Sequence, residues 1–283
     1  MNLQDRLQHH LTHLVRERDP YFATEGRFYV QQYIREELGQ WGHVVSRELT
    51  VRRHSYQNLI LDLPAHTDSG KGLKAPVLIG AHYDAVVGSP GADDNATGVA
   101  VLLELARLFA LEPASYPIRL VAFDLEELGC LGSQQYAAEL RSQGQTLRLM
   151  ISLEMLGYCN PSPNSQRYPP GIQYFYPDRG NFIGLIGNFP TLLDLICLSR
   201  MMRRSGTPCE WLPAGKRGIL VPDTRRSDHA PFWDQGYGAI LVTDTAFLRN
   251  PNYHKPSDRL ETLDLAFLTG VCQGLEAGIR QLW

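Results

Sequence analysis

The chain has 283 residues, of which 43% are hydrophobic and 20% charged, a composition typical of a globular protein large enough for one α/β domain. Its formal net charge of −3 gives no basic field for nucleic acid or a membrane surface, so we expect a small-molecule or peptide partner. The five cysteines show no CxxC spacing, which argues against a disulfide scaffold and a thiolate zinc site. The N-terminal residues lack the apolar run of a signal peptide, and we expect a cytoplasmic location.

The N-terminal quarter of the sequence predicts two helices followed by two paired strands. Apolar residues recur at helical spacing in two segments that Asp19-Pro20 separates, and they alternate with polar residues further on. The predicted helices cover 3–16 and 24–41, and the predicted strands cover 43–53 and 57–63.

The remaining sequence alternates between buried-strand and helical patterns. This alternation predicts an α/β fold with a mainly parallel mixed sheet sandwiched between helices. The predicted strands lie at 77–80, 118–124, 148–153, 182–187 and 239–243, with a short extended segment at 218–222. The predicted helices lie at 99–111, 132–141, 190–203 and 263–282, with a short one opening at 228–232.

One long segment, residues 158–181, has little regular pattern and is rich in Pro, Tyr and Gly. The core pattern resumes directly after it, so we expect a substrate-binding loop rather than a linker.

The strand at 77–80 runs into His82-Tyr83-Asp84, and Asp93-Asp94 stands directly before the next helix. Side chains at the carboxyl end of a parallel strand reach the edge where ligands bind in open α/β sheets. One aspartate suffices to cap a helix, so capping does not explain why a second one stands there. Its place beside a strand-end histidine indicates a different role. We hypothesise that His82 binds a divalent cation, that Asp84 accepts its other ring N–H, and that one aspartate of the pair is a ligand.

Further acidic residues and a histidine are expected at the same edge of the sheet. Glu126 and Glu127 follow the strand at 118–124, Glu154 follows the strand at 148–153, and His254 follows the last strand. Buried carboxylates are costly unless they are paired or bind metal. Two histidines and several carboxylates suit zinc, and two ions sharing a carboxylate would use them all.

Six motifs of the chain, in this order, resemble those of the zinc-dependent exopeptidase family that contains bacterial leucyl aminopeptidases, glutamate carboxypeptidase II and, more distantly, glutaminyl cyclases. They are AHYD (81–84), PGADDNATG (90–98), FDLEELGCLGS (123–133), SLEMLGY (152–158), SDHAPF (227–232) and YHKPSD (253–258). The resemblance implies a phosphorylase/hydrolase-like fold. We therefore expect residues 1–283 to form one zinc-peptidase catalytic domain, in which the helices and strand pair of residues 1–70 cover the sheet.

The resemblance also implies two zinc ions per chain and a ligand set for each. His82 and Glu154 would bind one ion, Glu127 and His254 the other, and Asp93 would bridge both. The family position that corresponds to Glu154 is more often Asp. The resemblance further implies a cis peptide bond between Asp93 and Asp94.

Two more residues take catalytic roles by the same resemblance. Glu126 would be the general base that takes the proton from the metal-bridging water and returns it to the leaving amine, and Asp84 would orient His82. Substrate contacts are expected at Asp228, His229, Tyr253 and Tyr174, with packing as the alternative role of His229.

These expectations favour a di-zinc aminopeptidase acting on the N-terminal residue of peptides or amino-acid conjugates. One alternative is a single-zinc glutaminyl-peptide cyclotransferase, although those enzymes usually carry Trp where Tyr253 stands. A second is a carboxypeptidase, and a third is a non-catalytic binding homologue that has lost its ligands. A carboxypeptidase needs cationic side chains that bind the substrate carboxylate. Four arginines in loops are candidates for this role, and the alternative is that they are ordinary surface charges. They are Arg167, Arg179, Arg225 and Arg226.

Overall fold

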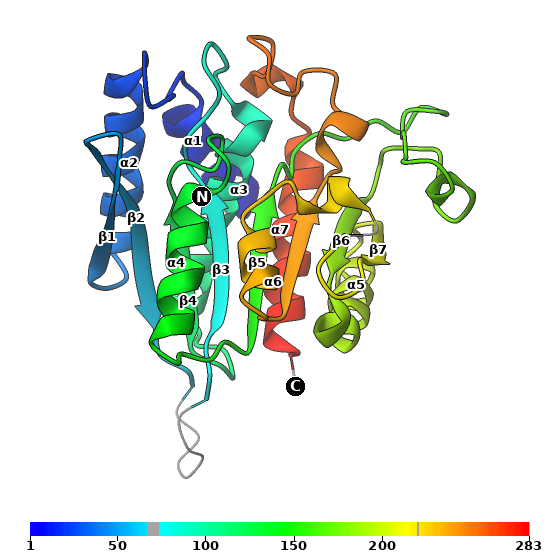
Figure 1. Ribbon diagram of the computed structural model, residues 1–283. Coiled ribbons are helices and arrows are strands. Elements are labelled where there is room, and N and C mark those ends of the chain that lie inside the picture. Colours follow the sequence, from blue (N-terminus) through cyan, green and yellow to red (C-terminus); the bar gives the residue numbers. More distant parts are fainter. Residues whose placement is uncertain (67–73, 220, 283) are drawn as a thin grey trace.

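A computed structural model of the chain describes residues 1–66, 74–219 and 221–282. Its eight strands form one mixed sheet in the order β1-β2-β4-β3-β5-β8-β6-β7 (Figure 1). The pairs β4/β3, β3/β5, β5/β8 and β6/β7 are parallel, and the pairs β1/β2, β2/β4 and β6/β8 are antiparallel. The strands are β1 (Val44–Val51), β2 (His54–Leu63), β3 (Val77–His82), β4 (Ile118–Phe123), β5 (Leu149–Glu154), β6 (Ile183–Gly187), β7 (Cys209–Pro213) and β8 (Ala239–Thr243).

Helices cover both faces of the sheet, as the sequence predicted. The helices α1, α2, α3, α5 and α7 pack on one face, and α4 and α6 pack on the other (Figure 1). Side chains of the central strands alternate between these layers, with Ile79 and Leu120 on the first face and Leu78 and Val121 on the second. The helices are α1 (Leu3–Leu14), α2 (Thr24–Gly39), α3 (Gly98–Leu111), α4 (Leu131–Ser142), α5 (Leu192–Arg204), α6 (His229–Asp234) and α7 (Leu265–Arg280).

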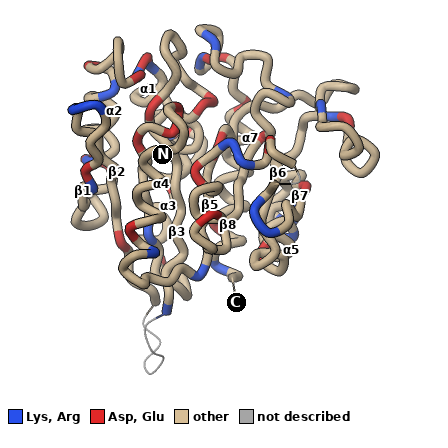
Figure 2. Tube along the Cα trace, in the orientation of Figure 1, with Lys and Arg blue, Asp and Glu red and all other residues tan. Residues whose placement is uncertain are grey.

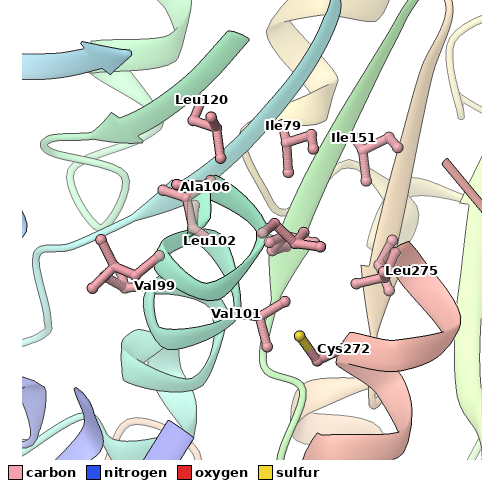
Figure 3. Close-up of a cluster of buried hydrophobic side chains, with 14 of the residues drawn as sticks. Ile79, Val99, Val101, Leu102, Ala106, Leu120, Ile151, Cys272 and Leu275 are labelled. Atoms are coloured by element: carbon pink, nitrogen blue, oxygen red, sulfur yellow. The ribbon is translucent and has the colours of Figure 1, made fainter. Parts of the chain in front are cut away.

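Helix α3 is the centre of the larger core. Its sequence is apolar almost all round, which suits a helix with the sheet on one side and α1, α2 and α7 on the other. Val101 and Leu102 project from α3 among Ile79, Ile151 and Leu275, which come from β3, β5 and α7 (Figure 3). The helix begins directly after the Asp93-Asp94 segment, so the same core fixes where that segment lies.

Two sequence predictions about the outer strands were wrong. The strand pair β1 and β2 does not cover the sheet but extends it, because β2 pairs with the central strand β4. The extended segment predicted at 218–222 forms turns and the start of a 3-10 helix, Pro222–Arg225, in its described residues. The strand next to β6 is instead β7 (Cys209–Pro213), a five-residue edge strand that ends in proline.

None of the helices in the described ranges combines the length and the apolar character that crossing a membrane requires.

Replacing Leu102 by alanine tests the core around α3. Because the Leu102 side chain is fully buried, the change removes buried carbon atoms and leaves a cavity, and we expect the free energy of unfolding to fall by about 2–5 kcal/mol. Urea denaturation measures this loss. Leu111→Ala is the matched control, since Leu111 lies on the same helix with 64% of its surface exposed and should change stability by less than about 0.5 kcal/mol. Equal losses in the two variants would contradict this packing.

Candidate active site

The carboxyl ends of three adjacent parallel strands bring the predicted ligands together. His82 ends β3, Glu126 and Glu127 follow β4, and Glu154 ends β5. Acidic residues gather beyond the upper ends of these strands in Figure 2. His254 reaches the same place from the loop after β8. The predicted grouping of these five residues is thus present in the structure.

Asp94 lies between the two histidines. One of its oxygens, Oδ1, is 3.3 Å from His82 Nε2, and the other, Oδ2, is 3.2 Å from His254 Nε2. Each histidine also faces a glutamate of its own. His82 Nε2 is 3.3 Å from Glu154 Oε2, and His254 Nε2 is 3.3 Å from Glu127 Oε2. The side chains therefore form two clusters joined by the single carboxylate of Asp94.

The sequence analysis assigned this bridging position to Asp93, and the geometry places Asp94 there instead. The Asp93 carboxylate points away from the histidines and accepts hydrogen bonds from Gly157 N (2.8 Å) and Asn250 Nδ2 (2.7 Å). The cis peptide bond is also one residue later than expected, between Asp94 and Asn95. Asp93 thus anchors the segment to its surroundings, while Asp94 faces the two histidine and carboxylate clusters, which together are called the centre below.

The donor set fits divalent cations. Asp94 Oδ1 and Glu127 Oε1 are buried and have no hydrogen-bond partner, which is costly for carboxylate oxygens unless a cation is close. The ligand atoms of His82, Asp94 and Glu127 lie within 4.8 Å of one another. Imidazole nitrogen and carboxylate oxygen together are ligands that zinc uses in proteins.

The charges of the cluster also favour cations. Burial alone would lower the pKa of His82, but the carboxylates of Glu154 and Glu126 raise it well above its usual value. Burial likewise opposes the charged form of His254, yet contacts with Asp94 and Glu127 raise its pKa to about 10. The carboxylates thus hold protons on both imidazoles in the absence of metal, and metal binding would release those protons.

Asp84 connects the ends of β3 and β4. Its Oδ1 accepts a hydrogen bond from Glu126 N (3.0 Å), and its Oδ2 accepts one from Glu127 N (3.2 Å). The same Oδ1 lies 3.5 Å from His82 Nδ1, on the side of the ring opposite the cluster. Asp84 is therefore placed to orient His82, the role that the resemblance implied, and it also fixes the backbone of both glutamates.

Glu126 stands apart from the two histidine clusters. Its Oε2 is 3.9 Å from His82 Nε2, and its Oε1 accepts a hydrogen bond from the Cys130 thiol at 3.4 Å. Burial raises the pKa of Glu126 well above the usual value of a glutamate. A carboxyl group with a raised pKa is suited to accept and donate a proton near neutral pH.

Two polar residues that the sequence analysis did not single out support Glu154 and Asp94. Ser227 donates a hydrogen bond to Glu154 Oε2 at 2.7 Å. Asn95 donates one to Leu153 O at 2.8 Å and accepts one from Met155 N at 3.1 Å, which ties the Asp94 segment to the end of β5. Both residues lie inside the recognised motifs, SDHAPF and PGADDNATG, which was the available signal.

An apolar cavity of about 110 Å³ opens beside Glu154. Its walls come from β6, β7 and β8, from the Ala246–Leu248 turn and from segment 158–181, which extends beyond β6 and β7 in Figure 1. That segment contributes Tyr168, Pro169, Ile172 and Tyr176. Tyr174, the substrate contact predicted there, is 82% exposed and is not part of the wall. Tyr168 and Tyr176 occupy the place that Tyr174 was expected to take.

A second, polar and more open cavity of about 750 Å³ lies on the other side of the centre, beside Glu126 and Glu127. Tyr253 lines both cavities, and its ring stacks on His254 with 3.7 Å between ring centroids. Tyr253 is therefore placed where a bound substrate would pass.

Asp228 and His229 lie beneath the centre rather than on a cavity wall. Burial raises the pKa of Asp228 to about 7, and the charges of His82 and Glu154 are close enough to affect it. His229 Nε2–H donates a hydrogen bond to Thr224 O (2.7 Å), and the ring packs edge-on against Trp233. Burial lowers the pKa of His229 to about 4, so its ring is neutral at physiological pH. This environment matches the packing alternative for His229.

The four loop arginines have partners within the chain. Arg225 pairs with Asp234 at 2.7 Å, and Arg226 pairs with Asp223 at 3.1 Å. The other two, Arg167 and Arg179, donate to the main-chain oxygens of Phe247 and Pro161. Arg225 and Arg226 line the polar cavity, where an acidic side chain already pairs with each of them, and Arg167 and Arg179 line neither cavity.

Comparison with solved structures shows the same fold in other proteins. The Legionella pneumophila LapA aminopeptidase aligns with a TM-score of 0.72 at 19% identity, over 98% of this chain and 70% of that one. Bacteroides thetaiotaomicron glutaminyl cyclase, solved with N-acetylhistamine, aligns with a TM-score of 0.68 at 17% identity, over 99% of this chain and 97% of that one. These similarities confirm the expected fold.

Sequence comparison identifies the family. The chain is 34% identical over 259 residues to YfbL of Escherichia coli K12, an uncharacterized protein, with 86% of this chain and 77% of YfbL covered. It is 36% identical over 114 residues to aminopeptidase YwaD of Bacillus subtilis, but this match spans 39% of the chain and only 25% of YwaD. The model of peptidase family M28 matches residues 58–177. The chain therefore belongs to peptidase family M28, in agreement with the resemblance that its six motifs showed.

Proposed function

We propose that the protein is a di-zinc aminopeptidase that removes N-terminal residues with apolar side chains from peptides. The observation that carries this proposal is the placement of Asp94, whose two oxygens face different histidines, each with its own glutamate. A centre for one ion would need only one of these clusters. Membership of peptidase family M28 and the similarity to the aminopeptidase YwaD support the peptidase reaction.

Each ion would have three ligand residues, of which Asp94 is shared. His82 and Glu154 would complete one site, and Glu127 and His254 would complete the other. Bound there, two divalent ions would polarise the scissile carbonyl and lower the pKa of the attacking water.

Glu126 would move the proton. It lies beside the polar cavity and is close to, but outside, both ligand clusters. It would accept the proton of the attacking water and then donate it to the leaving amine, which its raised pKa permits. Asp84 would keep Glu126 and His82 in place through the contacts described above.

The two cavities would divide the substrate. The apolar cavity beside Glu154 would take the side chain of the N-terminal residue, and the open polar cavity would take the rest of the peptide. Two carboxylates of the apolar cavity are already paired, Glu210 with Arg203 at 3.3 Å and Asp223 with Arg226 at 3.1 Å. They therefore do not select a cationic side chain. The arginine pairs described above also favour an aminopeptidase over a carboxypeptidase.

Hydrolysis of aminoacyl-anilides tests the reaction and the side-chain preference. We expect leucyl and phenylalanyl substrates to be cleaved at least about tenfold more efficiently than lysyl and glutamyl ones, because burial of an apolar side chain in an apolar cavity is energetically favourable. N-acetylated anilides should resist cleavage. Cyclisation of glutaminyl peptides without hydrolysis would instead identify a cyclotransferase.

The variant Glu126→Gln tests the assignment of the base. A glutamine keeps the shape of the side chain but cannot accept the proton, so we expect kcat to fall by about 10²–10⁴-fold while zinc content stays the same. Glu112→Gln, at an exposed position on the surface, is the control and should leave kcat unchanged. If kcat of Glu126→Gln stayed within about tenfold of the parent value, another group would have to be the base.

Zinc content after dialysis tests the bridging residue. We expect two zinc ions per chain in the parent protein and fewer than one in Asp94→Ala, because both sites lose a ligand. Asp93→Asn keeps an oxygen for Gly157 N and should retain both ions. Loss of zinc from Asp93→Asn, together with its retention in Asp94→Ala, would restore the bridging role to Asp93.

A further inference from the structure

Arg18 lies in the connection between α1 and α2 and is fully buried. Its guanidinium makes six hydrogen bonds, and main-chain carbonyl oxygens accept all of them. Two of these acceptors, Leu14 O and Arg16 O, are local. The other four are Tyr83 O (2.8 Å), Pro90 O (2.6 Å), Gly91 O (2.8 Å) and Asp94 O (3.3 Å).

The distant acceptors belong to the two segments that carry ligands. Tyr83 directly follows His82, and Asp94 is the residue placed between the two histidines. One side chain from the N-terminal region thus holds the backbone of both segments at once. Arginine suits this task because its planar fork presents five N–H groups in fixed directions.

Asp258 holds the same segment from the other side. Its carboxylate accepts hydrogen bonds from Asp93 N (2.9 Å) and Asp94 N (3.1 Å). The main-chain N–H of Asp94 is therefore fixed by Asp258 and its carbonyl by Arg18. A peptide segment held at both groups has little freedom to turn its side chain away from the centre.

Gly91 makes room for the guanidinium. Its φ of 58° lies in the left-handed region, and a Cβ there would stand 2.7 Å from Arg18 Nη2 and 2.9 Å from Nη1. The same Cβ would stand closer still to Asp94 O, so a larger residue at position 91 would crowd both the guanidinium and the carbonyl that it holds. The absent side chain of Gly91, a motif residue, thus leaves the space that Arg18, a residue outside every motif, occupies.

The energetic cost of burying Arg18 indicates a role beyond packing. Removing a guanidinium from water is expensive, and carbonyl acceptors offset only part of the cost of its charge. The negative charges that offset more of it come from the centre itself, from Asp94, Asp258, Asp84 and Glu127. An apolar side chain would fill the same volume without this cost.

We propose that Arg18 is a positioning residue of the metal centre, which sets the affinity of the centre for divalent cations by holding the Tyr83 and Asp94 backbone carbonyls. This inference rests on the metal centre of the proposed function. Arg18 touches neither a ligand side chain nor the substrate cavities and acts through Asp94 and His82.

The test compares Arg18→Met and Arg18→Lys with the parent protein in three measurements. They are the zinc dissociation constant by competition with a chelator, the absorption spectrum of the cobalt-substituted protein, and urea denaturation of the metal-free form. We expect Arg18→Met to bind zinc about 10–100-fold more weakly, as is typical when an outer partner of a ligand is lost. Its cobalt spectrum should change, and Arg18→Lys should recover part of the affinity.

Arg148→Met is the matched control. Arg148 pairs with the buried carboxylate of Asp194 at 2.7 Å, and it lies at the opposite end of β5 from Glu154. We expect this variant to lose stability while its zinc dissociation constant and cobalt spectrum stay those of the parent. Such a result separates the effect on the centre from a general loss of stability.

Gly91→Ala provides a second route, should Arg18→Met fail to fold. It keeps Arg18 but crowds the contact between its guanidinium and Asp94 O, and we expect it to weaken zinc binding by at least tenfold as well. A folded Arg18→Met or Gly91→Ala protein with the parent's zinc affinity and cobalt spectrum would overturn the inference. A parent protein that binds zinc tightly yet hydrolyses no peptide substrate would overturn the proposed reaction alone, because the affinity comparison would still decide the role of Arg18.

Discussion

The two oxygens of the Asp94 carboxylate face different histidines, and the rest of the structure keeps that carboxylate in place. A shared ligand must satisfy two partners at once, so a small rotation that suits one of them weakens contact with the other. The segment around Asp94 is correspondingly fixed on all sides, by the core of α3, by Asn95 against β5, and by Asp258 and Arg18 at the backbone.

The parallel sheet explains why most of the centre could be predicted from the sequence. Neighbouring parallel strands end at the same edge, so any residue that directly follows such a strand lies near the others. His82, Glu126, Glu127 and Glu154 all stand at that position in their strands, and recognising the strands was enough to group them. His254 lies on a loop, and its place after the last strand predicted that it would reach the same edge. The fold class followed from the same alternation of strands and helices.

The predictions that were wrong depended on contacts between distant parts of the chain. Asp93 and Asp94 are adjacent and identical, and what separates them is the pair of hydrogen bonds that Gly157 and Asn250 give to Asp93. Tyr174 could not be told from Tyr168 and Tyr176 by composition, because only the path of the segment decides which rings face the cavity. Arg18 stands outside every motif, and its four distant acceptors lie 65 to 76 residues further along the chain.

Segment 158–181 forms part of the wall of the apolar cavity and supplies no residue to the histidine and carboxylate clusters. Under the proposed function, selection of the substrate and chemistry on the substrate would therefore depend on different parts of the chain. Under the proposed function, exchange of this segment alone could re-target the enzyme to another side chain, whereas the ligands would stay unchanged. Segment 158–181 is thus the part of the molecule in which new specificities could arise at the least risk to catalysis.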